Sequence, residues 1–453
     1  MTGGVAGPGR AAGRAAAEPG ALGLAAHDRT PLVARALAGQ PDTVTRGGLW
    51  ALSDALTARL RADGFRRVLV RSDDPTHILR AIEGCHAVGA DLWIAHTNLP
   101  DPFIEEFTRR FGIELVVGDS DRPTGVTPVA GGPARRIHMM TSGTTGEPKV
   151  AIHTLESLLS RVRSGARVSV NRAGKWLLTY QPTGFAGLQV ALTAVLSHGL
   201  LVIPEERTPL GFYQAAVDHG VTQVSATATF WRSLLMVAKP GALGLRQITL
   251  GGEAVDQATL TRLRTAFPDT RITHIYASTE AGVVFAVHDG REGFPAAWLQ
   301  GPVQGVELRI RDGFLHIKTP NAMRAYATEA EQPLGEDGWL KTADQCEVRD
   351  DRVYILGRQD STINVAGSKV YPLSVERFLL GLSGVLEARV FGVPNPVAGA
   401  IVGAEVVLAE GLDPKATRME ILKACREQLP GYQVPRAFKI VDAIQVKASG
   451  KKG

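Results

Sequence analysis

The residues with the clearest capacity for chemistry form one short stretch, 141–149, which reads Thr-Ser-Gly-Thr-Thr-Gly-Glu-Pro-Lys. Gly143 and Gly146 allow the backbone to turn its N–H groups inward, the hydroxyl side chains add donors, and Lys149 adds a positive charge. Such a concavity suits the β- and γ-phosphates of a nucleotide. The alternative is an ordinary polar linker, which most clusters of Ser, Thr, Gly and Pro are.

Apolar residues flank this stretch on both sides. Residues 137–140 and 150–152 each read as a short buried strand, so the loop is expected to join two strands. The P-loop pattern G-x-x-x-x-G-K-[ST] does not fit, because Pro148 stands where the glycine before the lysine should be and Val150 follows the lysine. Since the loop leads into a strand, no helix dipole supplies the anion site. A phosphate site of another kind is predicted.

A second polar segment, Tyr276-Ala277-Ser278-Thr279-Glu280, follows a predicted strand at 272–276. In open α/β sheets, ligands bind just beyond the carboxyl ends of the strands. At such a place Tyr276 can stack on a purine, Thr279 can hydrogen-bond a phosphate and Glu280 can hold Mg²⁺. A strand that ends in a polar turn is common, so this segment alone does not establish a site.

Together these segments resemble the adenylate-forming superfamily of acyl-CoA and aryl-CoA synthetases, peptide-synthetase adenylation domains and luciferases. Residues 141–149 resemble its phosphate loop, and 276–280 resemble its Y-x-x-T-E segment. Residues 250–254, Leu-Gly-Gly-Glu-Ala, resemble the Gly-Gly turn that lines the adenine and acyl pocket, although a tight strand-to-helix turn reads the same way. The resemblance covers about 68–451 and is strongest to the AMP-forming acyl-CoA synthetases.

Three further segments carry the resemblance toward the carboxyl end. Residues 338–344 are similar to G-W-x-x-T-G-D, which implies that Asp344 chelates the ribose hydroxyls. Residues 357–376 look like the junction between the two family domains, where Arg358 would contact ribose or phosphate. Residues 448–451, Ala-Ser-Gly-Lys, resemble the terminal S-G-K segment, whose lysine reaches the substrate carboxylate and the α-phosphate.

The resemblance thus implies a full set of site residues. Lys451, Lys149, Glu280 and Thr279 are expected to act in catalysis, with Glu280 also binding Mg²⁺ through ATP. The others are expected to bind ATP or AMP (Thr141, Ser142, Gly143, Thr144, Thr145, Gly146, Gly252, Glu253, Tyr276, Ala277, Ser278, Asp344, Arg358), to act as hinge (Asp360), to line the acyl pocket (Gly184, Phe185, Thr229, Phe230, Trp231, Gly251) or to line the thiol or pantetheine tunnel (Ala366, Gly367).

The substrate class follows from residues 180–187, which resemble the family's helix entrance. Members that activate α-amino acids place an Asp there to pair the ammonium group, and aryl-acid members often place Asn or His. Gly184 occupies that position here, so an α-amino acid is disfavoured because its ammonium group would be buried without a partner. Residues 229–231 make the expected pocket apolar and partly aromatic. A small or medium carboxylic acid, aryl or aliphatic, is expected.

The predicted reaction is ATP-dependent activation of this acid to an acyl-adenylate with release of pyrophosphate, followed by transfer to a thiol, with CoA as the expected acceptor. The rivals are transfer to a carrier-protein phosphopantetheine and transfer to an amine. A kinase would need an H-R-D-type loop, which the sequence lacks. A degenerate nucleotide-binding module is disfavoured by the joint presence of five charged residues: Lys149, Glu280, Asp344, Arg358 and Lys451.

The elements that must position these residues alternate in type. Strands are predicted at 68–70, 92–94 and 114–117, with helices at 76–88 and 103–111, which indicates βαβ units and a largely parallel sheet. After residue 276 the pattern changes to hairpins. The predicted fold is α/β, with a large domain of mostly parallel sheets and a small β region at 27–357, then a small mobile α+β domain at 358–453. Residues 1–26 are expected to be a disordered tail.

Composition sets the broad class. The 453 residues are 44% hydrophobic and 21% charged, as in soluble globular proteins, with a net charge of +5. The basic residues form no dense run, so a nucleic-acid partner is not expected. Cys85, Cys346 and Cys425 lie far apart, which disfavours a disulfide framework or zinc site and makes the cytoplasm the expected compartment. No apolar run approaches the ~18 residues of a membrane span. Oligomeric state stays open.

Overall fold

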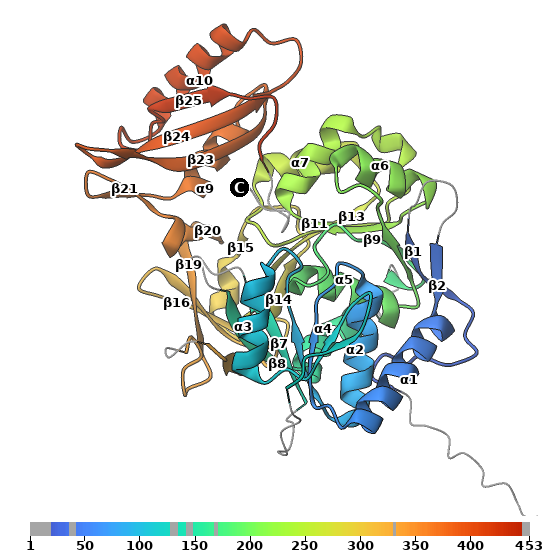
Figure 1. Ribbon diagram of the computed structural model, residues 1–453. Helices are drawn as coiled ribbons and strands as arrows, with labels where there is room; N and C mark the ends of the chain where they lie inside the picture. The colour runs from blue at the N-terminus through green and yellow to red at the C-terminus, as the bar shows by residue number, and fades with distance from the viewer. Residues whose placement is uncertain are drawn as a thin grey trace, which may run out of the picture.

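The structure is a computed structural model that describes residues 20–35, 42–126, 135–141, 148–166, 171–328 and 332–445. Three sheets build the large amino-terminal part, and a fourth builds a smaller carboxyl-terminal part (Figure 1). The predicted fold class, mixed α/β with a large and a small domain, is confirmed. No helix among the described residues is long and apolar enough to cross a membrane.

The first sheet has eight strands in the order β14-β13-β12-β11-β9-β10-β1-β2. Its six inner strands are parallel, whereas β2 and β14 are antiparallel edges. Short apolar strands joined by helices give this arrangement, as the sequence pattern predicts. The strands are β1 (Pro31–Arg35), β2 (Asp42–Thr45), β9 (Lys175–Leu177), β10 (Leu200–Ile203), β11 (Gln223–Ala226), β12 (Gln247–Leu250), β13 (Arg271–Ser278) and β14 (Gly282–Val287), with helices α5 (Phe185–Leu196), α6 (Pro209–Asp218), α7 (Ala228–Val237) and α8 (Gln257–Ala266).

The second sheet has seven strands in the order β18-β8-β7-β4-β3-β5-β6. Its parallel strands β3, β4, β5 and β7 continue into the antiparallel hairpin of β7 and β8. Buried side chains of α1, α2, α4 and α5 form the main core with residues of both sheets. The elements are β3 (Arg67–Val70), β4 (Asp91–Ile94), β5 (Leu115–Val117), β6 (Arg122–Pro123), β7 (Arg136–Thr141), β8 (Lys149–Thr154), β18 (Ala325–Tyr326), α1 (Arg46–Asp63), α2 (Pro75–Val88), α3 (Asp101–Phe111) and α4 (Leu155–Ala166).

The third sheet is the predicted hairpin region, and the fourth belongs to the small domain. Two-residue turns at 312–313 and 350–351 join successive antiparallel strands, as their Asp and Gly residues predict. The third sheet contains β15 (Phe294–Pro295), β16 (Glu307–Arg311), β17 (Phe314–Lys318), β19 (Leu340–Arg349) and β20 (Arg352–Arg358). The small domain contains β21 (Ile363–Val365), β22 (Ser368–Val370), α9 (Pro372–Leu380), β23 (Val385–Asn395), β24 (Gly399–Leu408), α10 (Pro414–Gln428) and β25 (Ala437–Ile440).

The amino-terminal segment corrects one expectation. The expected disordered tail includes residues 20–26, but Leu22 and Leu24 are buried in the main core. The amide groups of Ala21 and Leu22 donate hydrogen bonds to the Glu83 carboxylate on α2. Two buried leucines and a carboxylate that accepts two amides are enough to order so short a segment. The rest of the expected tail, 1–19, lies outside the described residues.

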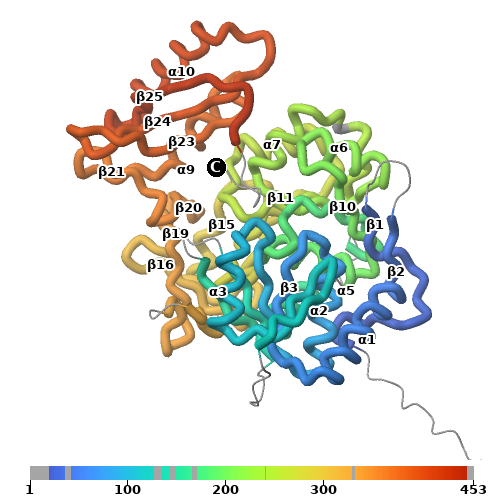
Figure 2. The backbone as a smooth tube through the Cα atoms, viewed as in Figure 1, coloured from blue at the N-terminus to red at the C-terminus, as the bar shows by residue number. Residues whose placement is uncertain are grey.

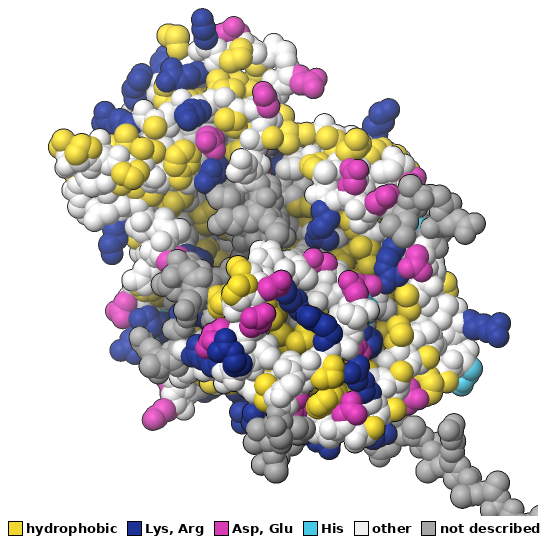
Figure 3. Space-filling model, in the orientation of Figure 1, with side chains coloured by type: hydrophobic (Ala, Val, Ile, Leu, Met, Phe, Trp, Pro, Cys, Tyr) yellow, Lys and Arg dark blue, Asp and Glu magenta, His cyan; other side chains and the backbone are white. Residues whose placement is uncertain are grey.

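The small domain lies beside the part of the large domain that carries α7 (Figure 2). Over the part of the face that the described residues form in Figure 3, basic and acidic side chains are interspersed. That distribution agrees with the absence of dense basic runs in the sequence.

Candidate active site

Strands of the first and second sheets end near the segments that the sequence predicts to be functional. Strand β7 ends at Thr141, next to the predicted phosphate loop, and Lys149 begins the returning strand β8 opposite it in register. The turn after β12 begins at Gly251, and β13 ends at Ser278. The loop residues Ser142, Gly143, Thr144, Thr145 and Gly146 lie outside the described residues, as does Lys451.

Tyr326 brings the predicted phosphate lysine and the predicted Mg²⁺ ligand together. Strand β18 pairs with β8, which sets Tyr326 opposite Ala151. Its hydroxyl donates a hydrogen bond of 2.5 Å to Glu280 Oε1, and the Lys149 Nζ lies 5.4 Å from the centre of its ring. A cation and a carboxylate therefore share one tyrosine, which is the charge pattern that a polyphosphate with a bound divalent cation requires.

A buried histidine links the same strand to the Thr279–Glu280 turn. His153 on β8 is fully buried, and its Nε2 lies 2.7 Å from the carbonyl oxygen of Thr279. Its Nδ1 lies 3.1 Å from Ser157 Oγ on α4. Burial lowers the pKa of His153 to about 4, so the ring is neutral near pH 7 and donates from Nε2 to the carbonyl.

Tyr276, Asp344 and Arg358 form a second cluster. The Tyr276 hydroxyl donates to the Asp344 carboxylate, and its ring packs 5.4 Å from Phe285. Burial, reinforced by the negative charge of Asp344, raises the pKa of Tyr276, which keeps the hydroxyl protonated. Pairing of β19 with β20 places Asp344 opposite Arg358.

Electrostatic interactions connect this second cluster to the first. Burial opposes the charge of Arg358, but Asp344, Asp360 and Glu280 together outweigh it and raise the pKa of the guanidinium. Arg358 thus lies in the field of carboxylates that come from three separate segments. Ala343, which replaces the glycine of the family pattern, lies inside β19 and does not need a left-handed backbone. The substitution leaves the position of Asp344 unstrained.

The two glycines of the turn after β12 are needed for different structural reasons. A Cβ on Gly251 would lie 2.8 Å from Ile275 Cγ1 on the neighbouring strand, so there is no room for a side chain. Gly252 has a φ of +82°, in the left-handed region. Glu253 follows, and its carboxylate accepts a 3.0 Å hydrogen bond from the Thr229 amide at the start of α7. The turn therefore holds the amino terminus of α7 in place.

The residues expected to line the acyl pocket differ in their surroundings. Gly184 precedes α5 as its N-cap, and Phe185 is buried. Thr229 and Trp231 are fully buried, and the Trp231 ring packs among core aromatics that include Phe267 at 6.2 Å. Their contact with an acyl group stays a prediction.

The hinge and tunnel residues lie at the start of the small domain. Asp360 belongs to a short helical turn, Gln359–Ser361, and its Oδ1 is 3.6 Å from Arg358 Nε. Ala366 and Gly367 form the exposed two-residue turn between β21 and β22, with φ values of 49° and 87°. The hydrogen bonds described for this turn stay within the small domain. Their roles stay predictions.

A buried ion network that the sequence did not predict joins the two domains. Arg232 on α7 donates from Nε to Glu387 on β23 at 2.7 Å and from Nη1 to Asp256 at 3.0 Å. The exposed fractions of the Arg232 and Glu387 side chains are 3% and 2%. Nearby, Arg262 on α8 donates to the carbonyl oxygens of Val385 and Leu386 at 2.5 and 3.0 Å. This network fixes the face of the large domain on which the small domain rests.

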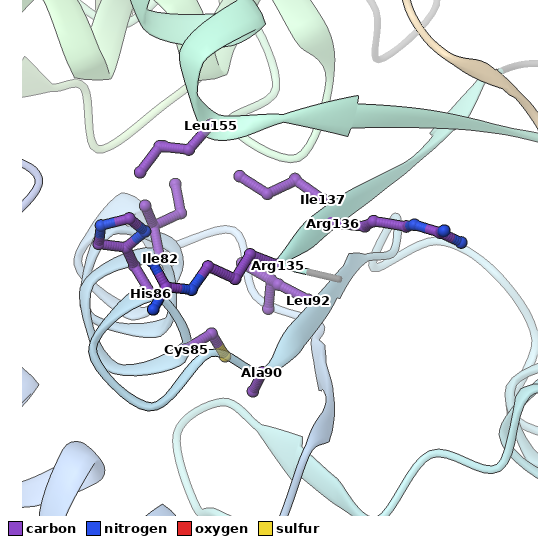
Figure 4. A pocket seen from close by; sticks show the side chains of 9 residues that line it. All are labelled: Ile82, Cys85, His86, Ala90, Leu92, Arg135, Arg136, Ile137 and Leu155. Carbon is purple, nitrogen blue, oxygen red and sulfur yellow. The ribbon is translucent and has the colours of Figure 1, made fainter. Parts of the chain in front are cut away.

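Another pocket lies away from these residues. It is lined by Cys85, His86, Arg135 and their neighbours, where β4 and β7 begin (Figure 4). Its volume of about 10 Å³ leaves room for about one water molecule. It lies at the end of β7 and β8 opposite to Lys149, so it is separate from the candidate site.

Comparison with known proteins defines the class. Residues 136–327 match the AMP-binding enzyme family, and 374–451 match the AMP-binding enzyme C-terminal domain, together more than half of the chain. The chain belongs to this family of AMP-binding enzymes, the adenylate-forming superfamily that its motifs resemble.

Individual relatives are more distant. The chain is 30% identical over 329 residues to a 2-succinylbenzoate–CoA ligase of Bacillus velezensis, an alignment that covers 69% of this chain and 66% of that relative. It is 28% identical over 476 residues to the fatty acid–[acyl-carrier-protein] ligase MmaC of Mycobacterium marinum, covering 88% of each. The o-succinylbenzoate CoA synthetase of Bacillus subtilis, solved with its acyl-adenylate intermediate, has the same fold, with a TM-score of 0.70, 23% identity and 94% coverage of each chain.

Proposed function

We propose that the chain activates a carboxylic acid with ATP, releases pyrophosphate, and passes the acyl group from the adenylate to a thiol. The observation that carries the proposal is the convergence of Lys149 and Glu280 on Tyr326, with Arg358 in the field of the same glutamate. These groups come from segments far apart in the sequence. An arrangement of cations around a carboxylate suits the charge of a polyphosphate.

The proposed first step needs no protein nucleophile. An oxygen of the substrate carboxylate attacks the α-phosphorus of ATP, and the bond from that phosphorus to the bridging oxygen breaks, so that pyrophosphate leaves. Lys149 and Arg358 would stabilise the negative charge on the phosphates, because preorganised charges supply most of the catalysis in such transfers. Lys451 would do the same at the substrate carboxylate.

The residues also fit a divalent cation. Glu280 offers a carboxylate oxygen, the ligand type that Mg²⁺ prefers, beside Lys149 and within the family phosphate region. Mg²⁺, when bound with ATP, would neutralise phosphate charge. Tyr326 orients the Glu280 carboxylate through its hydroxyl, and Tyr276 does the same for Asp344, the proposed ribose ligand.

The proposed substrate is an aryl or a small or medium aliphatic carboxylic acid. Gly184 at the N-cap of α5 provides no carboxylate for an ammonium group, which disfavours α-amino acids. A relative named for 2-succinylbenzoate supports an aromatic acid, and one named for fatty acids supports an aliphatic chain. CoA is the proposed acceptor. A carrier-protein phosphopantetheine is the second candidate, because the relative named for it aligns over 88% of both chains.

The test is ATP–pyrophosphate exchange with a panel of unsubstituted aryl acids, alkyl acids and free amino acids. We expect acid-dependent exchange with aryl or alkyl acids, AMP as the nucleotide product, and little exchange with amino acids. Formation of ADP would indicate a kinase, and no turnover with any acid would refute the proposal. The preferred acid is then tested with CoA and with a phosphopantetheinylated carrier protein, and thioester formation identifies the acceptor.

A further inference from the structure

Strand β8 presents one face to the Thr279–Glu280 turn. Alternate residues of a strand share a face, so Lys149, Ala151 and His153 point the same way, and Tyr326 lies opposite Ala151 in the ladder. Tyr326 holds the Glu280 side chain, while His153 holds the carbonyl oxygen of the preceding residue. The turn is therefore fixed to this face at two points, one on a side chain and one on the backbone.

We propose that His153 is a positioning residue that fixes the Thr279–Glu280 turn relative to the strand that begins with Lys149. The inference rests on the proposed function, in which Glu280 and Lys149 act on the same polyphosphate. A carbonyl oxygen only accepts hydrogen bonds, so His153 must carry its hydrogen on Nε2. The bond runs from the second sheet to the turn after β13 of the first sheet and joins the two halves of the site.

The surroundings of the ring restrict its position. Ser157 at the start of α4 contacts Nδ1, and the Phe185 ring at the start of α5 lies 6.2 Å from the imidazole centre. One buried side chain thus contacts three segments around the site. An ordinary core histidine would also be buried and paired. Its partner here, however, is the backbone that immediately precedes Glu280, and this placement gives it a role in the reaction.

The expected consequence of losing the Nε2 donor is a shift of the turn. Thr279 would keep its carbonyl but lose the partner that holds it, and Glu280 would move with it. Displacement of a reacting or charge-stabilising group by about 1 Å can cost on the order of 100-fold in rate. We therefore expect a 10- to 100-fold loss of exchange rate and weaker binding of Mg·ATP, in a protein that stays folded.

Three substitutions separate the donor from the shape of the side chain. His153→Gln can place an amide N–H near the Nε2 position, His153→Asn places it near the Nδ1 position, and His153→Phe keeps a ring without a donor. His274→Phe is the matched control, because His274 is also buried and its Nε2 contacts the Arg291 carbonyl at 3.0 Å, away from the turn. Unfolding temperature, Mg·ATP affinity by calorimetry and ATP–pyrophosphate exchange are measured for all four variants and the wild type.

We expect the exchange rate and Mg·ATP affinity of His153→Gln to stay within about threefold of wild type. His153→Asn and His153→Phe should lose at least tenfold in both quantities. His274→Phe should keep wild-type Mg·ATP affinity whatever its unfolding temperature. Equal loss in the Gln and Asn variants, or wild-type affinity and exchange in the Phe variant, would overturn the proposal. If the Phe variant does not fold, the Gln and Asn pair decides. Failure of the proposed function is seen separately, as absence of exchange in the wild type, and Mg·ATP affinity then still tests His153.

Discussion

Removing Arg232 should weaken the attachment of the small domain far more than removing an ordinary surface charge. Its guanidinium contacts Glu387 of the small domain and Asp256, Thr259 and Thr229 of the large one. Burial opposes the charge, but the two carboxylates outweigh it and raise the pKa of Arg232. The network is favourable only while it is complete, because each charge in it has been removed from water.

The size of the effect depends on which partner is removed. Arg232→Met leaves Glu387 and Asp256 buried without this partner, which should cost about 3–5 kcal/mol. Glu387→Gln leaves Arg232 paired with Asp256 and should cost about 1.5–3 kcal/mol, the value of a hydrogen bond to a charged group. The matched control is Arg389→Met. Its partner Glu405 is 3.2 Å away within the small domain, and the two side chains are 28% and 23% exposed. That change should cost less than about 1 kcal/mol.

Two measurements test this reasoning. Urea unfolding gives the loss of stability, and limited proteolysis within residues 358–372 with small-angle scattering reports whether the small domain stays docked. We expect cleavage rate and radius of gyration to increase in the order Arg389→Met, Glu387→Gln, Arg232→Met. If Arg232→Met and Arg389→Met behave alike in stability and cleavage, the network does not hold the domains together and the reasoning is wrong.

Three further predictions concern the site and the core. Lys149→Ala should raise the KM for ATP and lower kcat, and unchanged ATP kinetics would remove the loop from the phosphate site. Lys451→Ala should slow adenylate formation by a factor of about 10²–10³ but should still transfer the acyl group from supplied adenylate. Asp360→Pro fixes φ, so it should spare adenylate formation and suppress thioester formation. Equal loss of both half-reactions in each variant would contradict these assignments. Burial lowers the pKa of His138 to about 3. Between pH 6.5 and about 3 the unfolded state therefore binds a proton that the folded state does not. The free energy of unfolding should fall by about 1.4 kcal/mol for each pH unit across this range. His138→Phe, compared with wild type by urea unfolding at several pH values, should reduce this slope, and an unchanged slope would contradict the assignment.

Much of the fold follows from local patterns, because short apolar strands alternating with helical periods leave few arrangements other than parallel sheets. The placement of Asp344 opposite Arg358 does not follow from local patterns. The turn at 350–351 alone would set Arg358 opposite Ala343, and a bulge between Gln345 and Cys346 shifts the register by one residue. Gly357 lies beside the bulge, and a glycine inside a strand is a sign of one, but it does not tell which residues then pair.

The functional residues that were not predicted from the sequence have another explanation in common. Tyr326 lies in a two-residue strand, too short to show a period, and His153 lies in a strand that reads only as buried. Arg232 and Glu387 belong to different domains, so no local pattern connects them. Residues that meet only after the sheets have formed require the tertiary structure for their identification.

The order of the strands has a consequence for how the chain must be made. Strand β1 lies between β2 and β10, and Val33 pairs with Leu201, so the earliest strand in the described part of the chain pairs with one that is synthesised much later. Between them the chain builds most of the second sheet, which itself is completed only when β18 arrives. During translation both sheets therefore carry unpaired apolar edges, which are prone to aggregate, and non-local pairing is intrinsically slow. A fragment that ends before Ala325 would lack β18 and therefore the tyrosine that contacts both Lys149 and Glu280.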